Sequence, residues 1–126
     1  MHKILIVEDN EMNRDMLTRR LVRHGFNVCC ANDGPAGVAM AAEERPNLIL
    51  MDVALGSMDG WEATLLIKAS PVTAHIPVIA LTANALVSDR ESAFAAGCVD
   101  FETKPVDFDR LITRIRAVMV EGVGHA

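Results

Sequence analysis

Short apolar runs alternate along the chain with longer segments in which apolar residues recur at helical spacing. The runs are rich in β-branched residues and nearly free of polar side chains, which is typical of parallel strands buried on both faces. They predict strands, the last of them weak, over 3–7, 27–31, 48–51, 76–81 and 98–102.

The segments between these strands predict helices. Asn10 can cap the first helix, and Gly25 can supply the left-handed residue that ends it. The other helices are predicted over 34–44, 61–68, 87–96 and 107–119. Because each of five strands is followed by a helix after a short connection, the sequence predicts an α/β fold with a doubly wound, five-stranded parallel sheet and five helices.

The length and the composition suit one domain. The chain has 126 residues, of which 51% are hydrophobic, so it can bury a core without disulfide bonds or a structural metal. The domain is expected to cover residues 1–120, and the glycine-containing segment 121–126 is expected to be a short flexible tail.

Charge and cysteine usage narrow the class of protein. Twelve Lys and Arg residues against seventeen Asp and Glu residues give a net charge of −5, which argues against direct binding of nucleic acid. The spacing of Cys29, Cys30 and Cys98 is not that of a metal site. We therefore expect these three residues to be buried thiols in a reducing cytoplasm. No apolar run approaches a membrane span, and no signal peptide is present, so we expect a cytoplasmic protein without membrane partners.

Polar residues follow four of the five predicted strands. Glu8 and Asp9 follow the first strand, Asp52 the third, Thr82 the fourth and Lys104 the fifth. Ligands of such sheets bind outside the carboxyl ends of the strands. We therefore expect these five side chains to converge at one edge of the sheet.

The converging side chains suit phosphoryl transfer. Three carboxylates at about 5 Å repel one another by about 3 kcal/mol per pair at an effective dielectric constant near 20. A lysine and a hard divalent cation, Mg²⁺ rather than Zn²⁺, would offset this repulsion. A carboxylate nucleophile, a metal, a hydroxyl donor and an ammonium group together favour transfer of a phosphoryl group.

The segments Val7-Glu8-Asp9-Asn10, Met51-Asp52, Leu81-Thr82-Ala83 and Lys104-Pro105 closely resemble the receiver domain of two-component response regulators. The match covers nearly the whole chain, in order and at the family's spacing. Within the family, the chain resembles the single-domain regulators of the DivK type. The resemblance implies a CheY-like, flavodoxin-like sheet with the strand order 2-1-3-4-5.

The resemblance also implies a role for each acidic residue. Asp52 would accept a phosphoryl group from a phosphohistidine on a sensor histidine kinase or a histidine phosphotransfer protein. Glu8, Asp9 and Asp52, with the backbone carbonyl of Ala54, would hold Mg²⁺. The protein would be a phosphoacceptor switch that catalyses only its own phosphorylation and dephosphorylation.

Further residues would read out the phosphorylation in a protein of this family. Thr82 and Lys104 would each contact a phosphoryl oxygen, and the Lys104–Pro105 peptide bond is expected to be cis. Phe101 matches the family's switch aromatic and would swing inward with Thr82. This movement would reshape the face formed by the fourth helix, fifth strand and fifth helix, which binds a downstream protein target.

The resemblance places partner docking on the first predicted helix, at Asn10, Met12, Asn13 and Met16. The protein is expected to be a monomer or a weak dimer. A receiver domain cut from a hybrid histidine kinase or a larger regulator is an alternative, although the starting Met and the short tail favour a free-standing protein.

A few positions depart from the family's pattern. Gly56 stands where a proline is usual, which bears on the rigidity of the loop and not on the chemistry. Phe101 lacks the hydroxyl of a tyrosine. Ala54 and Asn84 occupy the two variable positions that flank the phosphoryl group, and the small Ala54 should let water approach.

Two other classes of function are weaker. A phosphohydrolase working through an aspartyl phosphate would want a second aspartate at position 54, where the chain has Ala54. A flavodoxin-like electron carrier would need a Ser-, Thr- or Gly-rich phosphate loop after the first strand, where Glu8 to Glu11 would repel a phosphate.

Overall fold

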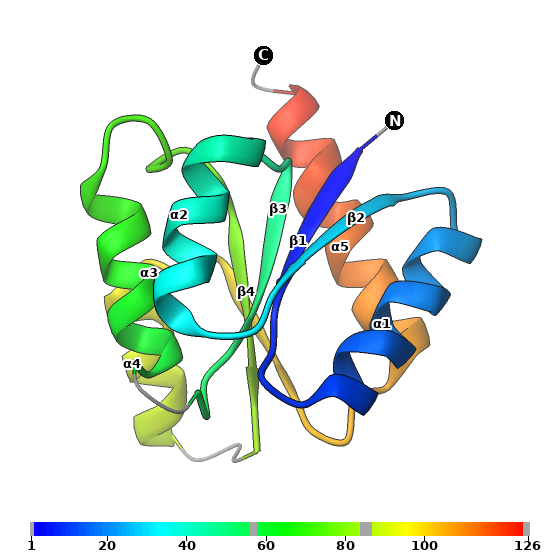
Figure 1. The fold of residues 1–126 in the computed structure, drawn as a ribbon, viewed down its shortest axis with the longest axis horizontal. Coiled ribbons are helices and arrows are strands. Elements are labelled where there is room, and N and C mark those ends of the chain that lie inside the picture. Colours follow the sequence, from blue (N-terminus) through cyan, green and yellow to red (C-terminus); the bar gives the residue numbers. More distant parts are fainter. Residues whose placement is uncertain (1, 56–57, 84–86, 125–126) are drawn as a thin grey trace.

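Five parallel strands form one sheet in the order β2-β1-β3-β4-β5, which confirms the predicted architecture (Figure 1). The computed structural model describes residues 2–55, 58–83 and 87–124, with the backbone alone for 87–89 and 120–124. The strands are β1 (Lys3–Val7), β2 (Asn27–Ala31), β3 (Leu48–Asp52), β4 (Val78–Thr82) and β5 (Asp100–Thr103).

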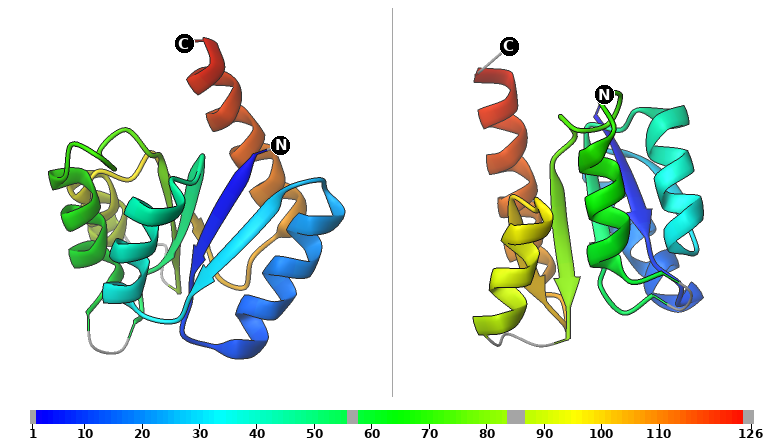
Figure 2. Two further views of the ribbon diagram at one scale, coloured as in Figure 1. Left: turned by 45° about the horizontal axis from the view of Figure 1, so that its top comes forward. Right: turned by 90° about the vertical axis from the view of Figure 1, so that its left-hand side faces the viewer.

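Helices cover both faces of the sheet (Figures 1 and 2). One face carries α1 (Glu11–Arg23) and α5 (Phe108–Gly124), and the other carries α2 (Gly34–Glu44), α3 (Gly60–Ala69) and α4 (Val87–Ala96). Successive strand residues point to opposite faces. Ile4 and Ile6 therefore pack toward α1 and α5, whereas Leu5 and Val7 pack toward the other three helices, and all four are fully buried.

The first helix begins and ends at the residues that the sequence predicts. The side chain of Asn10 accepts a hydrogen bond from the backbone N–H of Asn13 at 2.9 Å. Gly25 has a φ of 89°, the left-handed conformation that glycine adopts without a steric cost. These two residues set the length of α1 and its start beside the end of β1.

Two strands begin later than predicted, because the preceding backbone is bonded elsewhere. β4 begins at Val78 and not at Ile76, whose N–H donates to the Thr73 carbonyl at 3.0 Å within a turn. β5 begins at Asp100 and not at Cys98, whose N–H donates to the carbonyl of Ala93 at 3.0 Å and closes the end of α4.

The last helix is longer than predicted. α5 continues to Gly124, so residues 121–124, which the sequence analysis assigned to a flexible tail, are helical. Gly122 and Gly124 lower the intrinsic helix propensity of this segment, and that is why the prediction ended near residue 119. None of the helices in the described part of the chain is long and apolar enough to cross a membrane.

The three cysteines are free thiols. Cys98 is buried, as predicted, whereas Cys29 and Cys30 are only half-buried. They lie on β2, which is the edge strand of the sheet and has one neighbouring strand in place of two.

Candidate functional site

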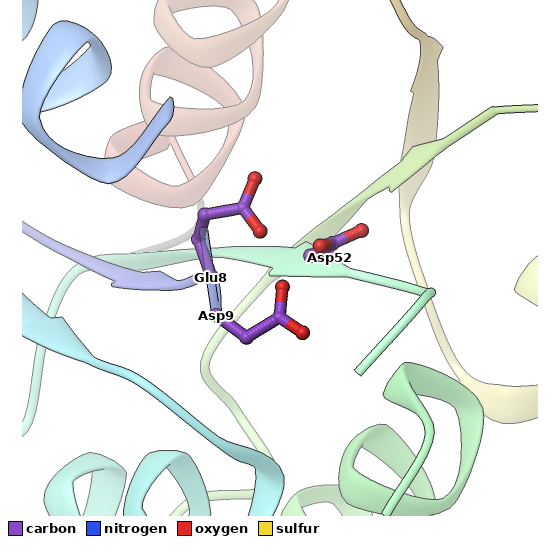
Figure 3. Close-up of side chains that lie close together, drawn as sticks. All are labelled: Glu8, Asp9 and Asp52. Carbon is purple, nitrogen blue, oxygen red and sulfur yellow. The ribbon is translucent and has the colours of Figure 1, made fainter. Parts of the chain in front are cut away.

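The carboxyl ends of β1 and β3 bring three carboxylates together (Figure 3). Glu8 and Asp9 directly follow β1, and Asp52 is the last residue of β3. One carboxylate oxygen from each of the three lies within 4.8 Å of the others. Glu8 and Asp52 are 1% and 2% exposed, whereas Asp9 is open to solvent.

A lysine that directly follows β5 neutralises part of this charge. Lys104 Nζ lies 2.9 Å from Asp52 Oδ1 and 3.4 Å from Glu8 Oε1. The backbone N–H of Lys104 donates to the carbonyl of Thr82, the last residue of β4, at 2.7 Å. The peptide bond between Lys104 and Pro105 is cis. The four strand ends named in the sequence analysis therefore meet at one edge of the sheet.

Backbone donors hold the two buried carboxylates. The N–H of Ala54 donates to Asp52 Oδ1 at 3.2 Å. The role of the Ala54 carbonyl as a metal ligand stays a prediction. The N–H of Asn10 donates to Glu8 Oε2 at 3.3 Å.

One residue at the site escaped the sequence analysis. Arg14 reaches back from α1 and donates to the backbone carbonyl of Glu8 at 2.9 Å. Its position one turn into a capped helix is the signal that could have indicated it, because side chains in the first helical turns point back toward the preceding loop.

The pKa values of the two buried carboxyls shift in opposite directions. Burial, a hydrogen bond with Asp52 and the charge of Asp52 raise the pKa of Glu8 from 4.5 to about 7. Burial acts in the same direction on Asp52, but the hydrogen bonds from Glu8 and Lys104 outweigh it and lower the pKa of Asp52. Near neutral pH, Asp52 is therefore the ionised carboxylate of the pair, and Glu8 carries the proton for part of the time.

We expect the protein in EDTA to lose stability as the pH rises from about 5 to 8. The folded state holds the Glu8 proton more tightly than the unfolded state, so this stabilisation is complete below pH 4.5 and is lost as the pH passes about 7. The shift corresponds to at most about 3 kcal/mol. Urea unfolding at several pH values measures it.

The matched variant for this prediction is Glu8→Gln, which cannot titrate. Its unfolding free energy should be nearly constant between pH 5 and 8. The pKa of Asp52 is lowered from 3.8, so its protonation changes the unfolding free energy only at pH values below this window. An unchanged pH dependence in Glu8→Gln would show that another group causes the loss of stability.

The donor set fits a hard divalent cation. All three side chains offer carboxylate oxygens, the ligands that Mg²⁺ prefers, and no sulfur or imidazole lies among them. Two of the three are buried around a single lysine, so a cation would relieve the repulsion that remains between the carboxylates.

A close approach of α3 supports the backbone of Asp52. A Cβ atom on Gly60 would lie 2.8 Å from Cα of Val53 and would also clash with the carbonyl oxygen of Asp52. The N–H of Gly60 donates to the carbonyl of Val53 at 3.0 Å. Only glycine fits here, a requirement that the sequence analysis did not recognise.

We expect Gly60→Ala to destabilise the protein by about 2–3 kcal/mol, because the added methyl group meets backbone and not a movable side chain. Urea unfolding measures the loss. Gly25→Ala is the comparison, since a Cβ atom there meets nothing within 4 Å and only the positive φ is strained. A smaller loss for Gly60→Ala than for Gly25→Ala would contradict the close approach.

Phe101 lies on β5 and packs outward against α4. Its ring meets Phe94 edge-on, with 6.3 Å between the ring centroids, and the guanidinium group of Arg90 lies 5.1 Å from its centroid. Neither α4 residue was singled out from the sequence. Gly56 and Asn84, which the sequence analysis named as departures from the family's pattern, lie outside the described residues.

The residues expected to dock a partner begin at the edge of the site. Met12 is 82% exposed and Met16 44%, whereas the side chain of Asn10 is occupied as the helix cap. Asn13 and Met16 line a pocket of about 540 Å³ together with Glu8 and Lys104. The first turns of α1 are therefore continuous with the acidic site.

Comparison with known proteins identifies the family. The model of the response regulator receiver domain family matches residues 4–116 of this chain. The response regulator PleD of Caulobacter vibrioides is 40% identical over 116 residues, which are 92% of this chain but only 26% of PleD. Protein PilH of Pseudomonas aeruginosa is 37% identical over 94% of this chain and 98% of PilH. The polar-differentiation response regulator DivK of Brucella anthropi is 35% identical over 92% of this chain and 94% of DivK.

Solved structures agree with these relatives. One similar structure is the receiver domain of the sensor histidine kinase PA1611 from Pseudomonas aeruginosa, which has a magnesium ion coordinated in its active site cleft. The two chains superpose with a TM-score of 0.87 at 37% identity, over 94% of this chain and 97% of that one. The Vibrio cholerae chemotaxis protein CheY4 superposes with a TM-score of 0.89 at 26% identity, over 94% and 98% of the two chains. With the acidic cluster and its lysine at the strand ends, these matches show that the chain belongs to the response regulator receiver domain family of two-component signalling.

Proposed function

We propose that the protein is a switch that accepts a phosphoryl group on Asp52 from a phosphohistidine of a histidine kinase or a histidine phosphotransfer protein. One observation carries this proposal. Asp52 is buried beside Glu8 and Asp9, and Lys104 lies 2.9 Å from its Oδ1. A buried carboxylate paired with a lysine can act as a nucleophile, in a site that can bind the charge of a phosphoryl group.

The proposed step is a displacement at phosphorus. A carboxylate oxygen of Asp52 forms the new O–P bond as the P–N bond of the phosphohistidine breaks. The bonding electrons return to the imidazole nitrogen. Lys104 and the hydroxyl of Thr82 would contact the oxygens of the transferred group. When bound by Glu8, Asp9 and Asp52, Mg²⁺ would neutralise charge that develops on those oxygens.

Phosphorylation would change the protein surface through movements of Thr82 and Phe101. Thr82 is buried at the end of β4, and Phe101 is half-buried on the neighbouring strand β5. If the Thr82 hydroxyl moves toward a phosphoryl oxygen, Phe101 can move inward from its contacts with Phe94 and Arg90. A downstream protein would then meet a different surface of α4, β5 and α5.

The same site argues for a switch and not for a turnover enzyme. Position 54 holds Ala54, so the carboxyl group that a phosphohydrolase would use as a proton donor is missing there. The relatives favour signalling as well. PilH and DivK are matched over nearly their whole length, and the PA1611 receiver domain contains magnesium in its cleft. On this proposal the protein acts in the cytoplasm, where its kinase partner has ATP.

A labelling experiment tests this proposal. The protein is incubated with acetyl phosphate in Mg²⁺ or in EDTA, and its intact mass is measured. We expect a mass increase of one phosphoryl group with Mg²⁺ and none with EDTA. Equal labelling under both conditions would contradict the metal dependence. No labelling under either condition would contradict the proposed phosphorylation, and the receiver would then act by binding alone.

A further inference from the structure

A pocket opens beside the acidic site, between α1 and the segment that follows β5. Its volume is about 540 Å³, which is the size of many small-ligand pockets. Glu8 and Lys104 belong both to this pocket and to the acidic site, and Asn13 is the third polar residue of its lining. The rest of the lining is apolar and consists of Met16, Leu17, Leu81, Pro105 and Val106. The phosphoacceptor chemistry gives this apolar part no role. It is called the α1 pocket below.

Core packing holds most of the apolar wall in place. Leu17 and Leu81 belong to the hydrophobic core beneath α1 and α5 and are buried. Val106 packs against the same core, whereas Met16 is 44% exposed. An apolar ligand would therefore meet a preformed wall on one side and a flexible methionine, which adapts to the shape of a ligand, on the other.

The α1 pocket lies beside the place where the phosphorus of a donor would be held. Lys104 Nζ is 2.9 Å from Asp52 Oδ1, and the same lysine lines the pocket. Figure 3 shows Glu8 on the side of the sheet that carries α1 and α5, and Asp9 on the side of α2 and α3. Because Asp9 is open to solvent, an apolar group bonded to the phosphoryl group loses more contact with water on the Glu8 side.

We propose that the protein also accepts phosphoryl groups from small acyl phosphates, and that the α1 pocket selects those with an apolar acyl group of about four or more carbon atoms. This inference rests on the proposed function and names a substrate class for the same site. An oxygen of Asp52 forms the new O–P bond as the P–O bond to the acyl group breaks. The bonding electrons leave with the carboxylate of the released acid.

The lining of the α1 pocket matches the two ends of such a donor. The acyl chain would lie against Met16 and Val106, and the side-chain amide of Asn13 offers an N–H group to the acyl carbonyl oxygen. The phosphoryl oxygens would meet Lys104 and a bound Mg²⁺.

The charge of the site disfavours other small amphipathic ligands. A free carboxylic acid would add its negative charge to three carboxylates that share one lysine. An apolar amine would compete with Lys104 for the same carboxylates. An acyl phosphate instead brings the group that the site is proposed to bind, and its apolar chain is left for the pocket.

The test compares acetyl, propionyl and butyryl phosphate as donors to the wild-type protein in Mg²⁺. The three released acids have nearly the same acidity, so the three phosphates are similarly reactive. Burial of each added methylene group should raise the second-order rate of labelling, measured by intact mass, by about fourfold, which gives about fifteenfold from acetyl to butyryl phosphate. Rates that are equal or that fall along the series would overturn the pocket as an acyl site.

Two substitutions in the α1 pocket should reduce this selectivity. Met16→Ser and Val106→Ser each remove apolar surface, so the ratio of the butyryl to the acetyl labelling rate should fall to about four or less. Val22→Ser is the matched control, since Val22 is an exposed apolar residue of α1 outside the pocket lining, and it should keep the wild-type ratio. Urea unfolding checks the fold of each variant. An unchanged ratio in both pocket variants would contradict the assignment.

Binding without transfer gives a second readout. In acetylmethylphosphonate and butyrylmethylphosphonate a methylene group replaces the bridging oxygen of the acyl phosphate, so no phosphoryl group can be transferred. With Mg²⁺, the butyryl analogue should bind about fifteenfold more tightly and should shift the NMR methyl signals of Met16 and Val106. Equal affinity for the two analogues would overturn the proposal.

Phosphoramidate separates the possible failures, because it has no acyl group. Labelling by phosphoramidate without a preference for butyryl over acetyl phosphate would overturn the role of the α1 pocket and leave the proposed function standing. No labelling by phosphoramidate or by any acyl phosphate would refute the proposed function, and this inference with it.

Discussion

Asp52→Asn should abolish labelling by phosphodonors while the fold stays intact. The amide that replaces the carboxylate has no negative charge and cannot form an acyl phosphate. The effect should be a loss of labelling of the order of a thousandfold or more, as for the removal of a nucleophile. Intact mass after incubation with acetyl phosphate and Mg²⁺ measures it, and urea unfolding checks the fold.

Asp33→Asn is the matched control for this substitution. The side chain of Asp33 caps α2 by accepting from the N–H of Ala36 at 2.7 Å, and asparagine caps helices about as well as aspartate does. This variant should therefore be labelled like the wild type. Normal labelling of Asp52→Asn would show that the phosphoryl group resides on another residue.

Lys104→Ala should separate phosphorylation from its readout. Asp52 keeps its carboxylate and the hydrogen bond from Ala54, so it should still be labelled, at a rate reduced by about tenfold. The contact between the phosphoryl group and the residue that follows β5 would be missing, so the environment of Phe101 should not change on labelling. Fluorine NMR of protein with fluorinated phenylalanine measures that change.

The same substitution should also destabilise the protein in EDTA. Lys104 is the only cation within ion-pair distance of Glu8 and Asp52 among the described residues. Its loss leaves two buried carboxyls without a counter-charge, at a cost of about 1–3 kcal/mol. Lys3→Ala is the comparison, since Lys3 pairs with Glu44 at 3.5 Å far from the site. A Phe101 signal that shifts on labelling of Lys104→Ala as it does in the wild type would contradict the coupling.

The sequence predicted the sheet and its polar edge because both depend on local patterns. Strands such as 3–7 and 27–31 are apolar runs between turn residues, and the structure has them with the same bounds. Parallel strands place their carboxyl ends at one edge, so Glu8, Asp52 and Lys104 had to converge there. The predicted starts of β4 and β5 were wrong because the N–H groups of Ile76 and Cys98 bond to earlier carbonyls in a turn and at a helix end, which the apolar pattern does not show.

Other features of the site depend on contacts between distant segments. No local pattern shows that Gly60 faces the backbone of Asp52 and Val53, because the approach of α3 decides it. The pKa of Glu8 depends on its burial and on a carboxyl forty-four residues away in the sequence. The surroundings of the Phe101 ring depend on Phe94 and Arg90 of the preceding helix. The acidic site was therefore predictable as a set of residues, whereas its electrostatics and its support were not.

The most direct test is to locate the phosphoryl group. Protein labelled with acetyl phosphate and Mg²⁺ is treated with borohydride, which reduces an aspartyl phosphate to homoserine, and its peptides are sequenced by mass spectrometry. We expect homoserine at position 52 and at no other aspartate. Reduction at another residue, or a stable label that borohydride does not remove, would contradict Asp52 as the phosphoacceptor.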